Sequence, residues 1–185
     1  MVQRQGKSQL PNEHELKEKL RVIPGFPKKG VNFIDITTVL KDPIAFRSVI
    51  DIFTDYFSKM NVDIVVGIEA RGFILGSVVA YNLGLGFVPA RKKGKLPAEK
   101  MSAEYTLEYG TEYIEMHTDA IRKGQRVAII DDLLATGGTA EATIRLVEKL
   151  GGIVAGLIFL VELDFLHGRD KLKGYTMLSL VHYDE

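Results

Sequence analysis

The sequence predicts an α/β fold in which helices flank a mostly parallel central sheet. Short apolar runs rich in β-branched residues, at 62–68, 127–130 and 153–161, are typical of buried parallel strands. Segments with helical periodicity alternate with these runs, which is the pattern of strand–helix–strand units. The N-terminal third has no such strand, and we expect it to form a small hood at about residues 20–40.

Length and composition fit one compact enzyme domain spanning residues 1–185. Apolar residues make up 46% and charged residues 26%, and the formal net charge is zero, so no nucleic-acid partner is expected. The chain has no cysteine, which excludes disulfides and a thiol nucleophile and is compatible with the cytoplasm. The first ten residues are polar and no run is long enough to span a bilayer, so neither secretion nor membrane insertion is expected.

Two helices are predicted in the N-terminal third. Asn12 and Glu15 have the spacing of a capping box and open a charged helix that ends at about Val22. Asp42 begins a second helix, whose apolar residues recur at helical spacing as far as Met60.

The middle of the chain predicts a strand–loop–helix unit and a hairpin. The strand at 62–68 precedes a helix at 73–83, and a further strand is expected at about 87–91. A hairpin then spans residues 105–118 and turns at Gly110.

The C-terminal part continues the alternation. We expect a helix to about Leu150, a strand at 153–161, a short helical turn near Arg169 and a last strand at 175–181.

The most informative motif follows the strand at 127–130. Two adjacent carboxylates, Asp131 and Asp132, precede two leucines and a loop of small residues. Such a loop brings backbone N–H groups close to an anion at the start of a helix, and ligands of α/β sheets bind at the carboxyl ends of strands. The pattern is neither a Walker A loop nor a dinucleotide-binding loop, and it favours a sugar phosphate. The alternative is an ordinary strand end and loop. The loop consists of Ala135, Thr136, Gly137, Gly138 and Thr139.

A second candidate anion site follows the strand at 62–68, where the chain reads Glu69, Ala70, Arg71. Arg71 is expected at the start of a helix, where its guanidinium adds bidentate phosphate recognition to free backbone N–H groups. The alternative is that Arg71 pairs with Glu69 or another nearby carboxylate.

The segment 91–100 carries five cations, a glycine and a proline without hydrophobic periodicity. We expect a flexible loop, at about 92–107, that closes over an anionic substrate. The alternatives are a solvated surface run or nucleic-acid binding, although no aromatic residues are interleaved with the cations. The cations are Arg91, Lys92, Lys93, Lys95 and Lys100.

Phe33 lies just after a glycine-led loop in the hood, where it is placed to stack on a planar purine. The alternative is that Phe33 is a core residue. The four histidines have no metal-ligand spacing and no partner serine, which argues against metal-dependent hydrolysis and a catalytic triad.

The motif of residues 131–139 resembles the phosphoribosyl pyrophosphate (PRPP) signature of the type I phosphoribosyltransferases, and from about Pro24 to Tyr183 the chain is most similar to the adenine-specific members. The resemblance implies the type I phosphoribosyltransferase fold and a homodimer. It also implies transfer of the 5-phosphoribosyl group from PRPP to adenine, which gives AMP and pyrophosphate in purine salvage.

The resemblance further implies a role for each motif. Asp131 and Asp132 hold the ribose hydroxyls, and the loop after them holds the 5′-phosphate. Glu108 acts near N7 of adenine, with an exposed strand carboxylate as the alternative interpretation, and Arg71 is the second catalytic residue. The pyrophosphate is bound by Glu69, Ala70, Arg71, Arg91, Lys92 and Lys95, with a cis peptide bond between Glu69 and Ala70. Adenine is bound by Asn32, Phe33, Ile34 and Leu133.

The resemblance also bears on Ile34, on Mg²⁺ and on the alternative functions. Related sequences commonly carry Arg at the position of Ile34, so only a backbone contact is expected there. Mg²⁺ is expected to bind through PRPP oxygens and water rather than through protein ligands. The alternatives to adenine transfer are a phosphoribosyltransferase for hypoxanthine, guanine, xanthine or a pyrimidine, and a non-catalytic PRPP-binding regulator.

Overall fold

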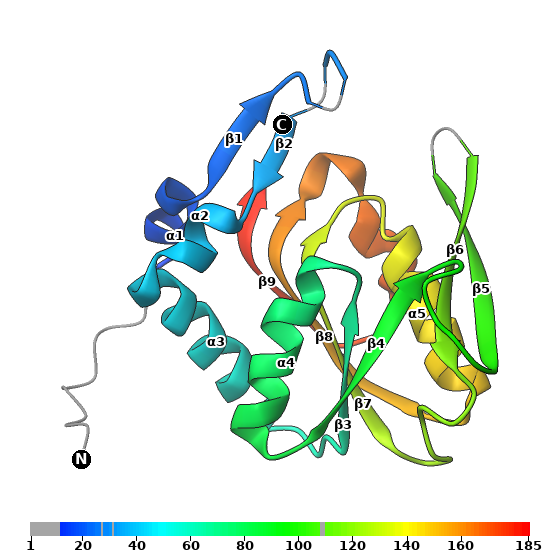
Figure 1. The fold of residues 1–185 in the computed structure, drawn as a ribbon. Coiled ribbons are helices and arrows are strands. Elements are labelled where there is room, and N and C mark those ends of the chain that lie inside the picture. Colours follow the sequence, from blue (N-terminus) through cyan, green and yellow to red (C-terminus); the bar gives the residue numbers. More distant parts are fainter. Residues whose placement is uncertain (1–11, 27, 31, 108–109) are drawn as a thin grey trace, which may run out of the picture. The chain divides into compact units, whose positions relative to one another are not determined.

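The computed structural model describes residues 12–26, 28–30, 32–107 and 110–185. The chain divides into two compact units, Met1–Ile52 and Phe53–Glu185. Helix α3 (Pro43–Ser58) runs from the first unit into the second (Figure 1). Within the described residues, no helix is long and apolar enough to cross a membrane.

The first unit begins with α1 (Glu13–Lys19), and the predicted capping box is confirmed. The backbone N–H of Glu15 donates to Asn12 Oδ1, and that of Asn12 donates to Glu15 Oε2, both at 3.0 Å. The predicted extension of this helix to Val22 is wrong, because β1 (Arg21–Pro24) pairs antiparallel with β2 (Asn32–Asp35). The β-branched Val22 and Ile23 suit a strand better than a helix end.

A short helix and an ion pair complete this unit. Helix α2 (Thr37–Lys41) follows β2, and the guanidinium of Arg21 pairs with the Asp35 carboxylate across the two strands, with Nε 3.0 Å from Oδ2. The N-terminus of α3 is capped as predicted, since Asp42 Oδ1 accepts hydrogen bonds from the backbone N–H groups of Ile44 and Ala45 at 3.0 and 3.1 Å.

The second unit is built on a seven-stranded sheet with the order β5-β6-β4-β3-β7-β8-β9. The five strands from β4 to β9 in this order are parallel, and β5 and β6 add an antiparallel hairpin at one edge. This mostly parallel sheet confirms the predicted fold class. The strands are β3 (Ile64–Ile68), β4 (Gly86–Lys92), β5 (Lys100–Leu107), β6 (Gly110–His117), β7 (Arg126–Leu134), β8 (Ile153–Leu163) and β9 (Met177–Tyr183).

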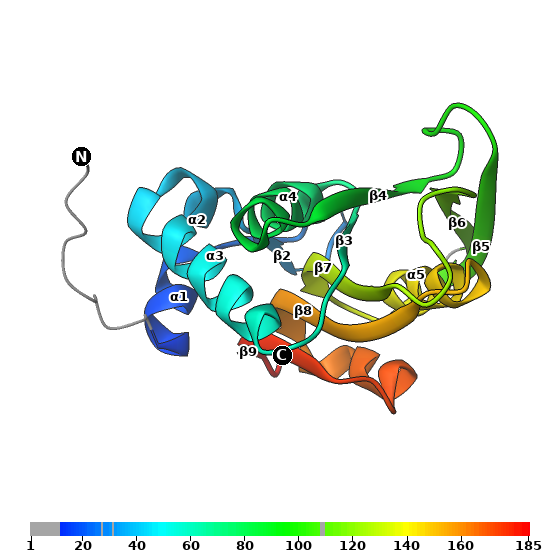
Figure 2. The same ribbon diagram turned by 90° about the horizontal axis from the view of Figure 1, so that it is seen from below.

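Helices α4 (Arg71–Leu83) and α5 (Gly138–Lys149) lie on opposite faces of this sheet (Figure 2). Strand β3 has β4 on one side and β7 on the other, so the order of the chain reverses between β3 and β7. The carboxyl ends of strands at such a reversal form a crevice where α/β proteins bind ligands.

The start of the predicted hairpin differs from the prediction. Strand β5 begins at Lys100 rather than at residue 105, and along it the buried Ala103 and Tyr105 alternate with the exposed Ser102 and Glu104. This alternation, which is typical of a strand, begins directly after the cationic segment. The glycine and proline of that segment favour a loop, which is why the start of the strand was placed too late. The helical turn near Arg169 is confirmed as two short 3₁₀ segments, η1 (Asp164–Leu166) and η2 (Gly168–Leu172).

Candidate functional site

The two adjacent carboxylates lie in the second half of β7, near its carboxyl end. The strand continues to Leu134, with Asp131 opposite Phe159 of β8 in the register, so the prediction that the strand ends at Ile130 is wrong. Pairing with β8 extends the strand past the polar residues. Asp132 is only 5% exposed, and its backbone N–H donates to Asp131 Oδ1 at 2.9 Å.

The environment of these carboxylates disfavours their charged forms. Desolvation, followed by the neighbouring Asp132, raises the pKa of the Asp131 carboxyl well above its ordinary value. Desolvation also raises the pKa of Asp132, although the nearby Arg71 guanidinium opposes this shift. Adjacent carboxylates with pKa values raised by desolvation are typical of a functional site.

Arg71 is the first residue of α4 and lies beside the carboxylates. Its Nε is 2.9 Å from Asp132 Oδ2, so the alternative interpretation, a pair with a nearby carboxylate, is confirmed. By hydrogen-bond geometry, this buried Oδ2 atom accepts no bond from the described residues. The close cationic neighbour of this oxygen is the Arg71 guanidinium.

Gly72 explains how α4 comes so close to β7. A Cβ atom at Gly72 would lie 2.7 Å from the carbonyl oxygen of Ile130 and 2.9 Å from Asp131 Oδ1. Only glycine allows this approach. The start of α4, with no described side chain capping it, therefore faces the carboxylate pair.

The small-residue loop after β7 wraps a cavity of about 110 Å³. This volume is several times the roughly 10–15 Å³ that a single water needs. Gly137 has a φ of 77° and precedes α5, whose N-terminus has no cap from a described side chain. The first N–H groups of α5 are therefore available to an anion. The lining consists of Asp131, Leu133, Leu134, Ala135, Thr136, Gly137, Gly138, Thr139, Ala140 and Phe159.

The loop between β3 and α4 contains the expected cis peptide bond, between Glu69 and Ala70. Glu69 Oε2 accepts hydrogen bonds from Arg91 Nε at 3.1 Å and from the backbone N–H of Lys92 at 3.0 Å. Glu69 thus joins this loop to the end of β4. Arg91 also donates to the carbonyl oxygen of Lys95 at 2.9 Å.

The cationic segment after β4 is attached to the hairpin by several contacts. The backbone N–H of Gly94 donates to the buried Glu115 at 3.0 Å, and Lys93 lies 4.4 Å from the ring centroid of Tyr113. The side chains of Lys92 and Lys95 are exposed. The predicted closure of this segment over a substrate stays a prediction.

The residues predicted to contact the base lie in different parts of the chain. Asn32, Phe33 and Ile34 are consecutive in β2 of the first unit, where Ile34 is buried and Asn32 exposed. Phe33 is half-buried, and its ring meets Phe26 edge-on at a centroid distance of 5.3 Å. Leu133 belongs to the second unit and lines the cavity. Glu108 lies outside the described residues.

Two residues next to the loop were not predicted from the sequence. Tyr105 of β5 packs on the loop, with its Cδ2 3.4 Å from the position of a Cβ at Gly138. Burial raises the pKa of Tyr105, and a hydrogen bond with Thr139 partly opposes this shift. Gly168 of η2 contacts the backbone of Ala135 and Gly137. Tyr105 belongs to a recognisable alternation, whereas no sequence signal marks Gly168.

The Phosphoribosyl transferase domain family matches residues 35–179 of the chain. The adenine phosphoribosyltransferase of Acetivibrio thermocellus is 59% identical over 170 residues, which cover 91% of this chain and 99% of that protein.

Solved structures give the same correspondence. The adenine phosphoribosyltransferase of Thermoanaerobacter pseudethanolicus is 55% identical, with a TM-score of 0.90 and coverage of 93% of this chain and 100% of that one. The Saccharomyces cerevisiae enzyme, complexed with D-2,5-dideoxy-2,5-imino-altritol 1,6-bisphosphate and adenine, is 42% identical, with a TM-score of 0.85 and coverage of 91% and 97%.

Proposed function

The chain belongs to the phosphoribosyltransferase family, and on this premise we propose how its residues act on PRPP and adenine. It transfers the 5-phosphoribosyl group from PRPP to adenine and gives AMP and pyrophosphate, a purine-salvage reaction. The observation that carries the residue assignment is the adjacent pair of the half-buried Asp131 and the buried Asp132, beside a phosphate-sized cavity at the start of α5.

Asp131 and Asp132 accept hydrogen bonds from the 2′- and 3′-hydroxyls of the ribose. Asp131 lines the cavity and Asp132 follows it in the chain, which supports this role. Carboxylates in a desolvated site also stabilise the positive charge that develops at C1′ as pyrophosphate leaves. Only their ionised forms act in this way.

The phosphate loop, residues 135–139, holds the 5′-phosphate. Its support is the cavity that the loop lines and the uncapped start of α5, where backbone N–H groups and the helix dipole favour an anion. Each charge-assisted hydrogen bond contributes about 1.5–3 kcal/mol, which fixes the sugar for the transfer.

Arg71 binds the pyrophosphate together with the loop of Glu69 and Ala70. Its guanidinium lies beside Asp132, so pyrophosphate and that carboxylate compete for the guanidinium. Arg91, Lys92 and Lys95 contribute further positive charge from the segment beside this loop.

Five residues are assigned to the adenine base. Phe33 stacks on it, Asn32 and Ile34 bind it through their backbone atoms, and Leu133 also contacts it. Exposure of part of the Phe33 ring supports stacking. Glu108 serves as the acid–base group near N7 of adenine.

Mg²⁺ fits this donor set only as an ion carried by PRPP. The site offers two adjacent carboxylates, one of them paired with Arg71, which do not form an all-protein cage. When bound through the pyrophosphate and water, Mg²⁺ neutralises leaving-group charge.

We extend the proposal to the organisation of the protein. Both units belong to one phosphoribosyltransferase domain, since the family match spans the boundary at residues 52 and 53. The protein acts in the cytoplasm, because its substrate PRPP is a polyanion that does not cross a bilayer. A homodimer is supported by Ile74 and Tyr81, exposed apolar residues seven apart on α4.

Turnover with separate bases tests the proposal. The protein is incubated with Mg²⁺–PRPP and adenine, hypoxanthine, guanine, xanthine or a pyrimidine base, and both pyrophosphate and nucleotide are followed. AMP formation is expected with adenine. Turnover of another base but not of adenine would contradict the specificity, and tight PRPP binding without turnover of any base would favour a regulator.

A further inference from the structure

The start of η2 packs against the phosphate loop, residues 135–139. A Cβ atom at Gly168 would lie 2.1 Å from the carbonyl oxygen of Ala135 and 2.9 Å from the nitrogen of Gly137. A Cβ atom at Gly137 would in turn lie 2.4 Å from the carbonyl oxygen of Gly168. The two backbones therefore touch, with no room for a side chain between them.

Arg169, the next residue of η2, ties this turn to the sheet. Its Nε donates to Glu162 Oε1 at 2.9 Å and its Nη2 donates to Glu162 Oε2, which makes a bidentate ion pair. Ser179 of β9 donates to the same Oε2 at 2.6 Å. Arg–carboxylate forks of this kind fix geometry as well as charge.

Glu162 lies close both to Arg169 and to the end of the strand that precedes the phosphate loop. It is 3% exposed in β8 and lies opposite Leu134, the last residue of β7 before the phosphate loop. Desolvation raises the pKa of Glu162, but the hydrogen bonds from Arg169 and Ser179 outweigh it and leave the pKa lowered. The carboxylate thus stays ionised and maintains its ion pair with Arg169.

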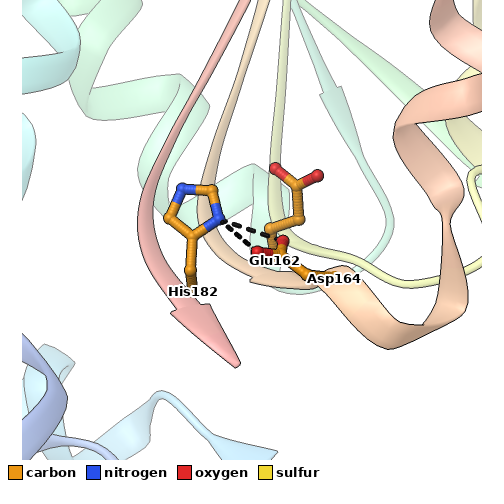
Figure 3. Close-up of side chains that lie close together, drawn as sticks. All are labelled: Glu162, Asp164 and His182. Atoms are coloured by element: carbon orange, nitrogen blue, oxygen red, sulfur yellow. Dashed lines mark hydrogen bonds and ion pairs between the residues drawn. The ribbon is translucent and has the colours of Figure 1, made fainter. Parts of the chain in front are cut away.

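Glu162 also lies near Asp164 and His182, and one atom from each comes within 4.8 Å of the others, a separation suited to a metal ion (Figure 3). The contacts argue against a metal here. His182 Nδ1 pairs with Asp164 Oδ1 at 3.0 Å, and both oxygens of Glu162 already accept bonds from the cationic Arg169 or from Ser179. A guanidinium beside the carboxylate repels a cation.

We propose that Arg169 is a positioning residue for PRPP. Its bidentate ion pair with Glu162 fixes the position of Gly168. The backbone of Gly168 in turn keeps the phosphate loop in the conformation that binds the 5′-phosphate. This inference rests on the proposed function and deepens it, because it assigns part of the affinity for PRPP to residues that do not touch the ligand.

Gly168→Ala tests the contact itself. The backbone of Gly168 does not adopt a positive φ, so the obstacle to alanine is the steric conflict with Ala135 and Gly137. Because a misplacement of about 1 Å costs on the order of 100-fold in rate, we expect the KM for PRPP to rise at least about 10-fold. The KM for adenine is expected to change less than about twofold, since the base does not touch this loop. Gly86→Ala is the matched control, as its Cβ would meet nothing closer than 3.8 Å.

Arg169→Lys and Arg169→Gln test the fork. Lysine keeps the charge but not the bidentate geometry, so we expect the KM for PRPP to rise with Lys and to rise further with Gln. Glu162→Gln combined with Arg169→Gln is expected to equal the worse single variant, because the two residues act as one unit. Should Gly168→Ala fail to fold, Arg169→Lys decides, since its side chain is 47% exposed.

Calorimetric binding of ribose 5-phosphate, without Mg²⁺ or adenine, separates this inference from the proposed function. Weaker binding by the Gly168 and Arg169 variants, with the Gly86 control unchanged, supports the positioning role even for a protein that turns over no base. Variants that melt at lower temperature but bind ribose 5-phosphate and PRPP like the wild type would overturn it, since Arg169 would then be structural only.

Discussion

Replacing Gly72 by alanine places a methyl group between α4 and β7, at the point where Arg71 meets the carboxylate pair. The new Cβ would lie 2.7 Å from the carbonyl oxygen of Ile130 and 2.9 Å from Asp131 Oδ1, whereas ordinary contact begins at 3.4 Å. The helix and the strand must therefore separate by about 0.7 Å, the difference between 2.7 and 3.4 Å. Both partners are packed backbone segments, which do not yield as a flexible side chain does.

Two opposing effects set the change in stability. Overpacking of this size costs about 1–3 kcal/mol, whereas alanine gains up to about 1 kcal/mol over glycine in a helix. The overpacking is larger, and we expect a net loss of about 1–2 kcal/mol in the free energy of unfolding. Displacing Asp131 and Arg71 by about 0.7 Å should also lower kcat/KM for PRPP roughly 10-fold or more.

Denaturant unfolding and steady-state kinetics measure the two effects, and Gly76→Ala in the same helix is the control. A Cβ at Gly76 would lie 3.0 Å from the Phe87 ring, a side chain that can shift, so stability within about 1 kcal/mol of wild type and unchanged kinetics are expected. If Gly72→Ala matches the wild type in both measurements, the close approach of α4 to β7 has no role in holding the site.

Four further substitutions test the first unit and the assigned site residues. Hydrogen bonds from Arg21 and Thr37 lower the pKa of Asp35 from 3.8 to about 2. The ionised carboxylate therefore stabilises the fold above about pH 4, and this contribution is lost as the pH falls through 2. Asp35→Asn should lower the free energy of unfolding by at most about 2 kcal/mol at pH 7, and urea unfolding should show a smaller difference from the wild type at pH 3. Burial raises the pKa values of Asp131 and Asp132. Protonation removes a hydrogen-bond acceptor, so the KM for PRPP should increase as the solution is acidified. Asp132→Asn should raise the KM for PRPP about 10- to 100-fold at neutral pH, and an unchanged KM would exclude Asp132 from binding the ribose. Phe33→Leu should raise the KM for adenine about 3- to 10-fold and leave that for PRPP unchanged, whereas lower stability with an unchanged KM for adenine would assign Phe33 to the core. Glu108→Gln should lower kcat by about 10²- to 10⁴-fold at saturating substrates, and near-normal turnover would make it an exposed strand residue.

Local patterns were sufficient to predict most of the second unit. The β-branched runs gave β3, β7 and β8, and the small-residue loop was correctly placed before α5. These features depend on residues adjacent in the chain. The end of β7 was missed because Asp131 and Asp132 look like strand terminators, whereas pairing with β8 carries the strand to Leu134.

Contacts between distant residues were beyond the sequence patterns. The pair between Arg71 and Asp132 joins residues on two elements, and sequence reasoning left the partner of Arg71 open. Gly168 meets the phosphate loop across more than 30 positions, through a backbone contact that leaves no trace in residue type. Hydrophobic periodicity reports which face is buried, but it does not report which elements meet.

The central claim is that the site uses PRPP to convert adenine rather than another base. An equimolar mixture of adenine, hypoxanthine and guanine, supplied with limiting PRPP and Mg²⁺, lets the bases compete in a single reaction, and chromatography identifies the nucleotides formed. AMP should account for nearly all the product, with one pyrophosphate released per AMP. IMP or GMP as the main product would contradict the claim.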